Sequence, residues 1–153
     1  MNQELSYIHV KDFTTQSGFH ISTLQLSYQL FGLELGTAPV VLVNHALTAN
    51  SLVAGEYGWW NQVIGKNKTI DTNKFTIISF NIPGNGYDGL LIENYQNFVA
   101  KDIANLFLIA LRKLGILKLH SIIGGSLGGG IAWEMAVLNP VIATHIIPIA
   151  ADW

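Results

Sequence analysis

The sequence predicts an α/β fold, a mostly parallel sheet with flanking helices, from three observations. Short apolar runs without alternation, at residues 40–43, 75–80 and 119–123, are typical of strands covered on both faces. From residue 40 onward these strands alternate with helical segments, which favours parallel strands joined by right-handed crossovers. Finally, 50% of the residues are hydrophobic and only 12% are charged, a composition that favours an extensive core.

The remaining elements follow in chain order. Residues 19–31 mix apolar and polar positions with the period of a half-exposed, antiparallel strand, and residues 32–39 form a turn. Residues 81–89 are a loop, because proline, asparagine and glycine recur there. Residues 127–138 form a helix that ends before Pro140, and residues 145–150 form a last strand.

The clearest helix is predicted at residues 98–114. Arg112 and Lys113 lie in its last turn, where positive charge suits the helix dipole, and Gly115 is placed to end it. Its expected core stripe consists of Val99, Ile103, Phe107, Ala110, Leu111 and Leu114.

Composition excludes several classes of function. The formal net charge is −2 and lysine and arginine do not cluster, so we expect no nucleic-acid partner. No apolar stretch reaches the ~18 residues of a spanning helix, and residues 1–4 do not resemble a secretory leader, so we expect no membrane association. The absence of cysteine excludes disulfides and fits a reducing, cytoplasmic compartment. No repeat or linker divides residues 1–153.

The strongest motif is Gly124-Gly125-Ser126-Leu127-Gly128, a G-x-S-x-G sequence between a predicted strand and a predicted helix. This is the setting of a nucleophile elbow, in which a tight turn raises the serine hydroxyl at the carboxyl edge of the sheet. We expect Ser126 to be the nucleophile, in a strained backbone conformation, and Gly124 and Gly128 to avoid collisions. The alternative, a phosphate-binding loop, loses support because no G-x-x-x-x-G-K-[ST] pattern is present.

A serine nucleophile of this kind also needs an oxyanion hole. One donor is the backbone N–H after the serine, here that of Leu127, and the other comes from the loop after an earlier central strand. That loop is residues 44–48, and Leu47 is our candidate for the second donor. We expect His45 to be a strand-end histidine held by a loop carbonyl rather than a catalytic group.

At this point the sequence resembles the homoserine O-acetyltransferases, which are enzymes of the α/β-hydrolase fold. The resemblance runs from about residue 26 to the end of the chain. Its motifs are Asn44-His45-Ala46-Leu47-Thr48, Gly58-Trp59-Trp60, Ile64-Gly65, Ile70-Asp71-Thr72, Asn81 and Gly124-Gly125-Ser126-Leu127-Gly128-Gly129. It implies that Ser126 takes an acetyl group from acetyl-CoA and passes it to the hydroxyl of homoserine, the first committed acylation toward methionine.

The resemblance implies acetyl-CoA as a co-substrate, no bound cofactor and no metal, and it allows a homodimer of the full-length protein. The chain departs from the family at residues 81–89 (NIPGNGYDG), where the family has a loop rich in glycine, serine and threonine beside the active site. A related hydroxyl acceptor, and succinyl-CoA as donor, therefore stay open. Trp59 and Trp60 either line the substrate entrance or pack the loop against the sheet.

The partners that a serine nucleophile needs are missing. In this fold the order along the chain is serine, then an acid, then histidine. After Ser126, Glu134 lies inside a predicted helix, and His145 comes before Asp152, in the wrong order for a triad. No histidine follows Asp152. His9, His20 and His120 precede the serine and are not placed to act as its base. We therefore expect residues 1–153 to be the N-terminal part of one α/β-hydrolase domain, without its later strands and lid, and inactive alone.

Three interpretations follow from these observations. The first is an acyltransferase of the homoserine type, represented by its nucleophile-bearing part. The second is a serine esterase of the same fold, which releases the acyl group to water. The third is a non-catalytic interaction module that keeps the elbow without a triad. Incubation with acetyl-CoA and homoserine separates the first two, because O-acetylhomoserine favours the transferase and acetate alone the esterase. An acid and a later histidine in the downstream sequence would favour an enzyme over the interaction module.

Overall fold

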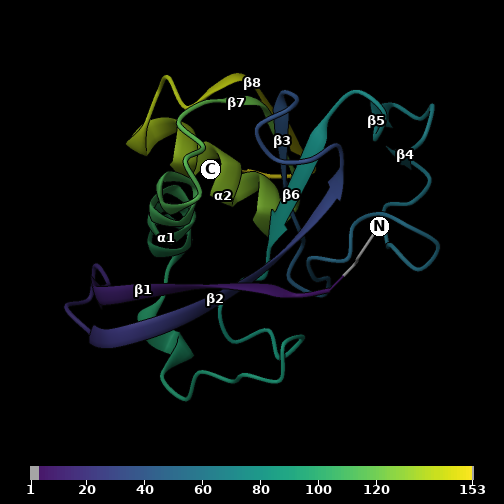
Figure 1. Cartoon of the computed structure of the whole chain (residues 1–153). Coiled ribbons are helices and arrows are strands. Elements are labelled where there is room, and N and C mark those ends of the chain that lie inside the picture. Colours follow the sequence, from purple (N-terminus) through teal and green to yellow (C-terminus); the bar gives the residue numbers. More distant parts are fainter. Residues whose placement is uncertain (1–3, 153) are drawn as a thin grey trace.

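A computed structural model describes residues 4–152 and contains a six-stranded sheet at its centre (Figure 1). The strand order is β1-β2-β6-β3-β7-β8, in which β6, β3, β7 and β8 run parallel and β2 runs antiparallel to both β1 and β6. These strands are β1 (Ser6–Thr14), β2 (His20–Gly32), β3 (Val40–Asn44), β6 (Thr76–Phe80), β7 (Leu119–Gly125) and β8 (Ala143–Ile149). The predicted α/β fold with a mostly parallel sheet is confirmed.

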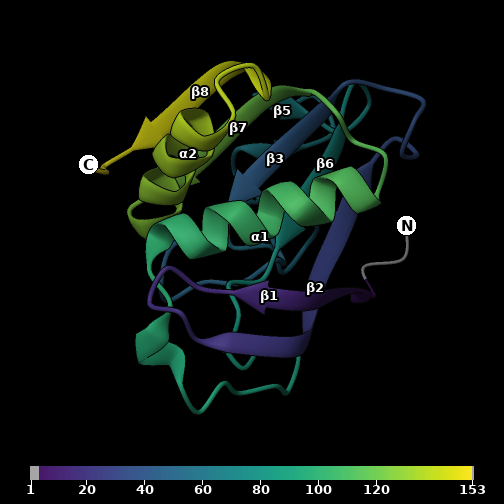
Figure 2. The ribbon, with the colours of Figure 1, turned by 90° about the vertical axis from the view of Figure 1, so that its left-hand side faces the viewer.

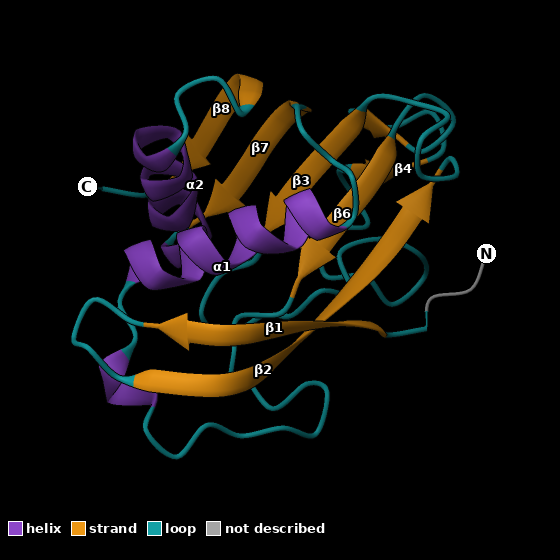
Figure 3. Cartoon of the chain, turned by 60° about the vertical axis from the view of Figure 1, so that its left-hand side comes forward, coloured by secondary structure: helices purple, strands orange, loops and turns teal. Residues whose placement is uncertain are grey.

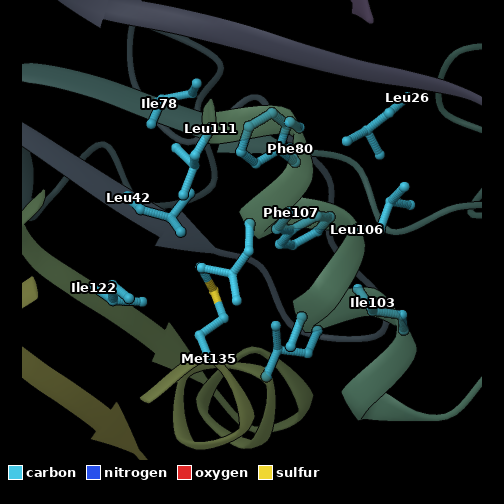
Figure 4. Close-up of a cluster of buried hydrophobic side chains, with 14 of the residues drawn as sticks. Leu26, Leu42, Ile78, Phe80, Ile103, Leu106, Phe107, Leu111, Ile122 and Met135 are labelled. Carbon is cyan, nitrogen blue, oxygen red and sulfur yellow. The ribbon is translucent and has the colours of Figure 1, made fainter. Parts of the chain in front are cut away.

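Both long helices, α1 (Ala100–Lys113) and α2 (Leu127–Leu138), cover one face of the sheet (Figure 3). Successive side chains of a strand point to opposite faces, so Leu42, Ile78 and Ile122 all point toward these helices. There they pack with Phe107, Leu111 and other fully buried side chains (Figure 4). Burying a side chain of this size contributes about 1.5–3 kcal/mol, so this cluster is the main core.

The opposite face is covered by the segment between β3 and β6 rather than by a helix. The neighbouring side chains Val41, Ile77 and Ile123 pack there against Val53 and Ile64. This segment contains a small two-stranded parallel sheet of β4 (Ile64–Gly65) and β5 (Ile70–Asp71), which the sequence analysis did not identify. Two residues per strand are too short to produce a readable hydrophobic period.

An antiparallel hairpin forms the other edge of the sheet. β1 pairs with the first part of β2, from Thr14 opposite His20 to Ser6 opposite Tyr28, and the end of β2 pairs with β6. Figure 2 shows β1 and β2 lying side by side below α1. The antiparallel strand predicted at residues 19–31 is therefore confirmed, whereas β1 was not identified.

Helix α1 begins later than expected. A short 3₁₀ turn occupies Tyr95–Asn97, and Val99 is the extended residue before the first helical turn, with 52% of its surface exposed. Its inclusion in the core stripe was therefore wrong. Asp102 accepts hydrogen bonds from the backbone N–H of Val99 (3.0 Å) and of Gln16 (2.8 Å), which joins the helix to the β1–β2 turn. At the other end, Gly115 takes a positive φ of 74° after Arg112 and Lys113, as expected.

Beyond β7, the sheet ends at β8. Both strands were predicted, and α2 has the bounds that the sequence indicated. No other strand formed by residues 4–152 pairs with the outer edge of β8, and Ile147 and Ile149 are each 42% exposed. None of the helices in this range is long and apolar enough to cross a membrane. The N-terminal residues considered for a leader include 1–3, which lie outside the described residues.

Candidate active site

The candidate site forms where β3 and β7 end side by side. The two strands are parallel, and Asn44 is paired with Gly124. Because parallel strands leave a sheet at the same edge, the loop after β3 and the turn after β7 are neighbours. Leu47 and Leu127 each lie three residues beyond this pair, so the structure brings the two predicted donor segments together.

Ser126 occupies a sharp turn between β7 and α2. Its φ of 52° and ψ of −123° lie in a region that L-residues rarely adopt, as the elbow prediction requires. Its N–H donates to Ile149 O (2.9 Å), and its carbonyl accepts from the N–H of Gly129 (2.8 Å) and of Gly130 (3.1 Å). The backbone is therefore held on both sides while the residue is exposed at the surface.

The glycines around Ser126 permit two close backbone approaches. A Cβ atom on Gly124 would overlap Gly128 O. A Cβ atom on Gly128 would overlap Asn44 O and lie 2.7 Å from His45 O. By contrast, a Cβ atom on Gly125 would meet no atom within 4 Å. The prediction that Gly124 and Gly128 avoid collisions is therefore confirmed, and α2 packs directly against the end of β3.

Two backbone N–H groups beside Ser126 are available to a ligand. Leu127 is the first residue of α2, so its N–H has no partner four residues earlier within the helix. Leu47 lies in an exposed turn closed by a hydrogen bond from Ala49 N–H to Ala46 O. Within residues 4–152 neither N–H donates a hydrogen bond. Their role as the two donors of an oxyanion hole therefore stays a prediction.

His45 is 1% exposed and uses both ring nitrogens. Nδ1 lies 2.7 Å from Ala46 O, and Nε2 accepts from the N–H of Ile82 at 3.0 Å. Burial lowers the pKa of the imidazole below its ordinary value of 6.5, against the smaller opposing effect of the Ala46 carbonyl. The expectation of a histidine held by a loop carbonyl is confirmed.

A buried polar network, which the sequence analysis missed, supports the loop at residues 81–89. The Asn81 side chain donates to Ser27 Oγ (2.9 Å) and Ser51 Oγ (3.0 Å) and accepts from Ser51 N–H (2.9 Å). Ser27 in turn donates to Asp88 (2.6 Å), which lies in the loop itself. No local pattern signalled this network, because Ser27 lies at a polar position of the alternating strand and Asn81 begins the predicted loop.

The structure does not bring a triad together. His145 is paired with Ser121, five residues before Ser126, which along a strand is about 16 Å. Its ring lies instead 5.2 Å from that of His120 at the opposite end of the sheet. His9 and His20 lie in the β1–β2 hairpin. Among the described residues, no histidine donates a hydrogen bond to the hydroxyl of Ser126 or accepts one from it.

The two late acids lie on α2 and beyond the end of β8. Glu134 lies inside α2, as expected, and Asp152 is an exposed residue beyond β8. Both line an apolar surface pocket that also includes Trp133 and Val137. Across residues 4–152, no three histidine, aspartate or glutamate side chains are grouped so that they could hold a metal ion.

The paired tryptophans pack the loop on the second face of the sheet. Their ring centroids lie 4.8 Å apart, and Trp59 Nε1 donates to Asn50 O (2.8 Å). Trp60 packs against the buried cluster that contains Val41, Ile77 and Ile123. These contacts favour the packing interpretation over the substrate-entrance one.

Known proteins resemble this chain in sequence. Homoserine O-acetyltransferase of Haloarcula marismortui is 31% identical over 172 residues, and the match covers 99% of this chain and 42% of that protein. Homoserine O-acetyltransferase of Corynebacterium diphtheriae is 32% identical, with 97% of this chain and 42% of that protein covered. The chain therefore spans less than half the length of these curated relatives.

Solved structures resemble it as well. The crystal structure of homoserine O-acetyltransferase from Bacillus anthracis superimposes with a TM-score of 0.86 at 26% identity, over 97% of this chain and 47% of that one. Esterase E22 superimposes with a TM-score of 0.84 at 26% identity, with the same coverage. The sequence profile described as the alpha/beta hydrolase fold matches residues 39–151, which include β3, both helices and the Ser126 turn. The chain belongs to the α/β hydrolase fold family.

Proposed function

We propose that residues 1–153 are the nucleophile-bearing part of an acyltransferase that moves an acetyl group from acetyl-CoA to the hydroxyl of homoserine. The observation that carries the proposal is the Ser126 turn, in which an exposed serine with a positive φ lies between the end of β7 and the start of α2. The sequence relatives named homoserine O-acetyltransferase support this choice of substrates.

In the proposed reaction, Ser126 Oγ attacks the acetyl carbonyl carbon of the thioester. A C–O bond forms, the C–S bond breaks, the hydroxyl proton passes to a base, and CoA leaves as its thiol after protonation. The homoserine hydroxyl then attacks the acyl-enzyme and restores the serine. The N–H groups of Leu47 and Leu127 donate to the oxyanion in both steps, and losing one such donor typically costs about 10²–10³ in rate.

We propose further that residues outside 1–153 supply the base and the acid. A serine hydroxyl is a weak nucleophile without an adjacent base. His145 and His120 lie at the far end of β7, and both ring nitrogens of His45 are used by Ala46 and Ile82. The purified 153-residue chain should therefore show little or no transfer. Robust turnover of acetyl-CoA and homoserine by this chain alone would contradict the proposal.

A serine esterase is the second candidate, because esterase E22 superimposes as well as the transferase does. The two functions share the acyl-enzyme and differ in its acceptor, which is water in an esterase. With acetyl-CoA and homoserine as substrates of the complete protein, O-acetylhomoserine identifies the transferase, and acetate alone identifies the esterase.

The test of the nucleophile is Ser126→Ala in the complete protein that contains this chain. We expect loss of acyl transfer to background with folding retained, because only the attacking oxygen is removed. Circular dichroism and a thermal melt check the fold, and mass spectrometry detects O-acetylhomoserine. Activity that survives the substitution would show that Ser126 is not the nucleophile.

A further inference from the structure

The hydrogen bonds of His45 define its protonation state. Ala46 O can only accept, so Nδ1 carries the proton, and Ile82 N–H can only donate, so Nε2 carries a lone pair. The side-chain amide nitrogen of Asn85 approaches Nε2 at 3.5 Å and is also compatible with an acceptor there. The ring is thus a neutral imidazole protonated at Nδ1. Protonating Nε2 would place its N–H opposite the N–H of Ile82, so that neither group could accept a hydrogen bond.

The hydrogen bond from His45 Nδ1 to Ala46 O is made to the Ala46–Leu47 peptide, whose N–H is the proposed second oxyanion donor. The carbonyl of Ala46 and the N–H of Leu47 belong to one planar peptide unit, and no peptide bond among the described residues is cis. In a trans peptide the C=O and N–H point in opposite directions. Because the buried ring holds the carbonyl on the inner side, the Leu47 N–H points away from the ring, and Leu47 is 70% exposed.

Two hydrogen bonds fix this carbonyl. Besides the His45 ring, the N–H of Ala49 donates to Ala46 O at 3.0 Å. Hydrogen bonds to a carbonyl also polarise the amide and strengthen its N–H as a donor. The ring at the same time binds Ile82 at the start of the 81–89 loop, so one side chain joins the two loops beside the site.

Resting on the proposed function, we propose that His45 is a positioning residue for acyl transfer. Its Nδ1–H holds the Ala46–Leu47 peptide so that the Leu47 N–H faces the oxyanion, and its Nε2 fixes the 81–89 loop through Ile82. It touches neither substrate nor reacting atoms. The neutral Nδ1–H form is the one that performs both tasks.

Two substitutions separate the two bonds. In His45→Asn, the side-chain amide reaches the place of Nδ1 and can still donate to Ala46 O. In His45→Gln, the longer side chain reaches the place of Nε2 and can still accept from Ile82 N–H.

In the complete protein, we expect kcat to fall by about 100-fold in His45→Gln with KM for acetyl-CoA unchanged, because the Leu47 N–H that loses its support acts on the transition state. His45→Asn should retain kcat within about fivefold. Equal losses that follow thermal stability would show a merely structural role and overturn the proposal.

A measurement without turnover tests the same inference if both variants fail to fold. In ¹⁵N-histidine-labelled protein, two-bond ¹⁵N–¹H spectra should show His45 protonated only at Nδ1 at neutral pH, and the exposed His9 should show a mixture of tautomers. A protonated Nε2 on His45 would overturn the proposal. Since this result does not depend on activity, a protein with the Nδ1–H ring but without acetyl transfer would refute the proposed function and not the position of the ring.

Discussion

The backbone of Ser126 is strained, and its neighbours hold it there. A residue at such a positive φ costs about 1–3 kcal/mol, and surrounding contacts have to compensate. Here the compensation is visible in the bonds to Ile149 O, Gly129 N–H and Gly130 N–H. The spacing of the glycines was sufficient to predict this turn. It could not predict the contact of Gly128 with Asn44 and His45, because that contact joins residues more than 80 positions apart.

At the same scale, we expect Gly128→Ala to destabilise the fold by at least about 3 kcal/mol, because the new Cβ atom would overlap backbone atoms that cannot move independently. Gly125→Ala is the matched control, since its Cβ atom meets only open space and should change stability by less than about 1 kcal/mol. Urea denaturation measures both values. Equal stability of the two variants would show that α2 does not pack on the end of β3 as described.

His45 gives the stability of the fold a pH dependence. Because burial lowers its pKa, the unfolded chain binds a proton below pH 6.5 that the folded chain does not. The contribution of the neutral His45 ring to the free energy of unfolding is therefore constant above pH 6.5. It is lost as the pH falls from 6.5 toward the pKa of the folded state, by at most about 1.4 kcal/mol per pH unit. Urea denaturation at several pH values should show a smaller decrease for His45→Asn than for the exposed control His9→Asn. An identical decrease in both would contradict a buried neutral ring.

At the scale of elements, the strands that the sequence predicted are those with a strong pattern. Completely buried strands such as β3 and β6 produce short apolar runs, and α2 was predicted with its observed bounds. β1 was missed, although Ile8, Val10 and Phe13 are buried in it. Asp12 takes a positive φ there and interrupts the alternation between Val10 and Phe13. The network around Asn81 was missed because it joins three separate segments of the chain.

The hydrogen bonds of Asp102 join two elements, the start of α1 and the β1–β2 turn. We expect Asp102→Asn to lower the free energy of unfolding by about 2 kcal/mol, because the buried carboxylate accepts two backbone N–H groups and an amide brings only one acceptor. The exposed Glu93→Gln makes the same chemical change at the surface and should stay within about 0.5 kcal/mol of the unaltered protein. Thermal or urea unfolding compares the two, and equal values would contradict the proposed link.

At the scale of the whole molecule, no strand formed by residues 4–152 pairs with the outer edge of β8. The sequence of β8, ATHIIPI, has the continuous apolar run of a strand covered on both faces, yet Ile147 and Ile149 are partly exposed. The chain also spans only 42% of the Haloarcula marismortui relative. The proposal that the base and acid lie outside residues 1–153 agrees with both facts, since a further strand could pair with β8 beside the carboxyl edge that carries Ser126.

The acyl-enzyme on Ser126 is tested most directly by the mass of the complete protein after brief incubation with acetyl-CoA alone. We expect one added acetyl group, mapped by peptide sequencing to Ser126, which is lost on addition of homoserine as O-acetylhomoserine appears. The Ser126→Ala variant should acquire no such group. Formation of O-acetylhomoserine by a protein that never carries acetyl on Ser126, or an acetyl group on a different residue that homoserine removes, would contradict an acyl-enzyme on Ser126.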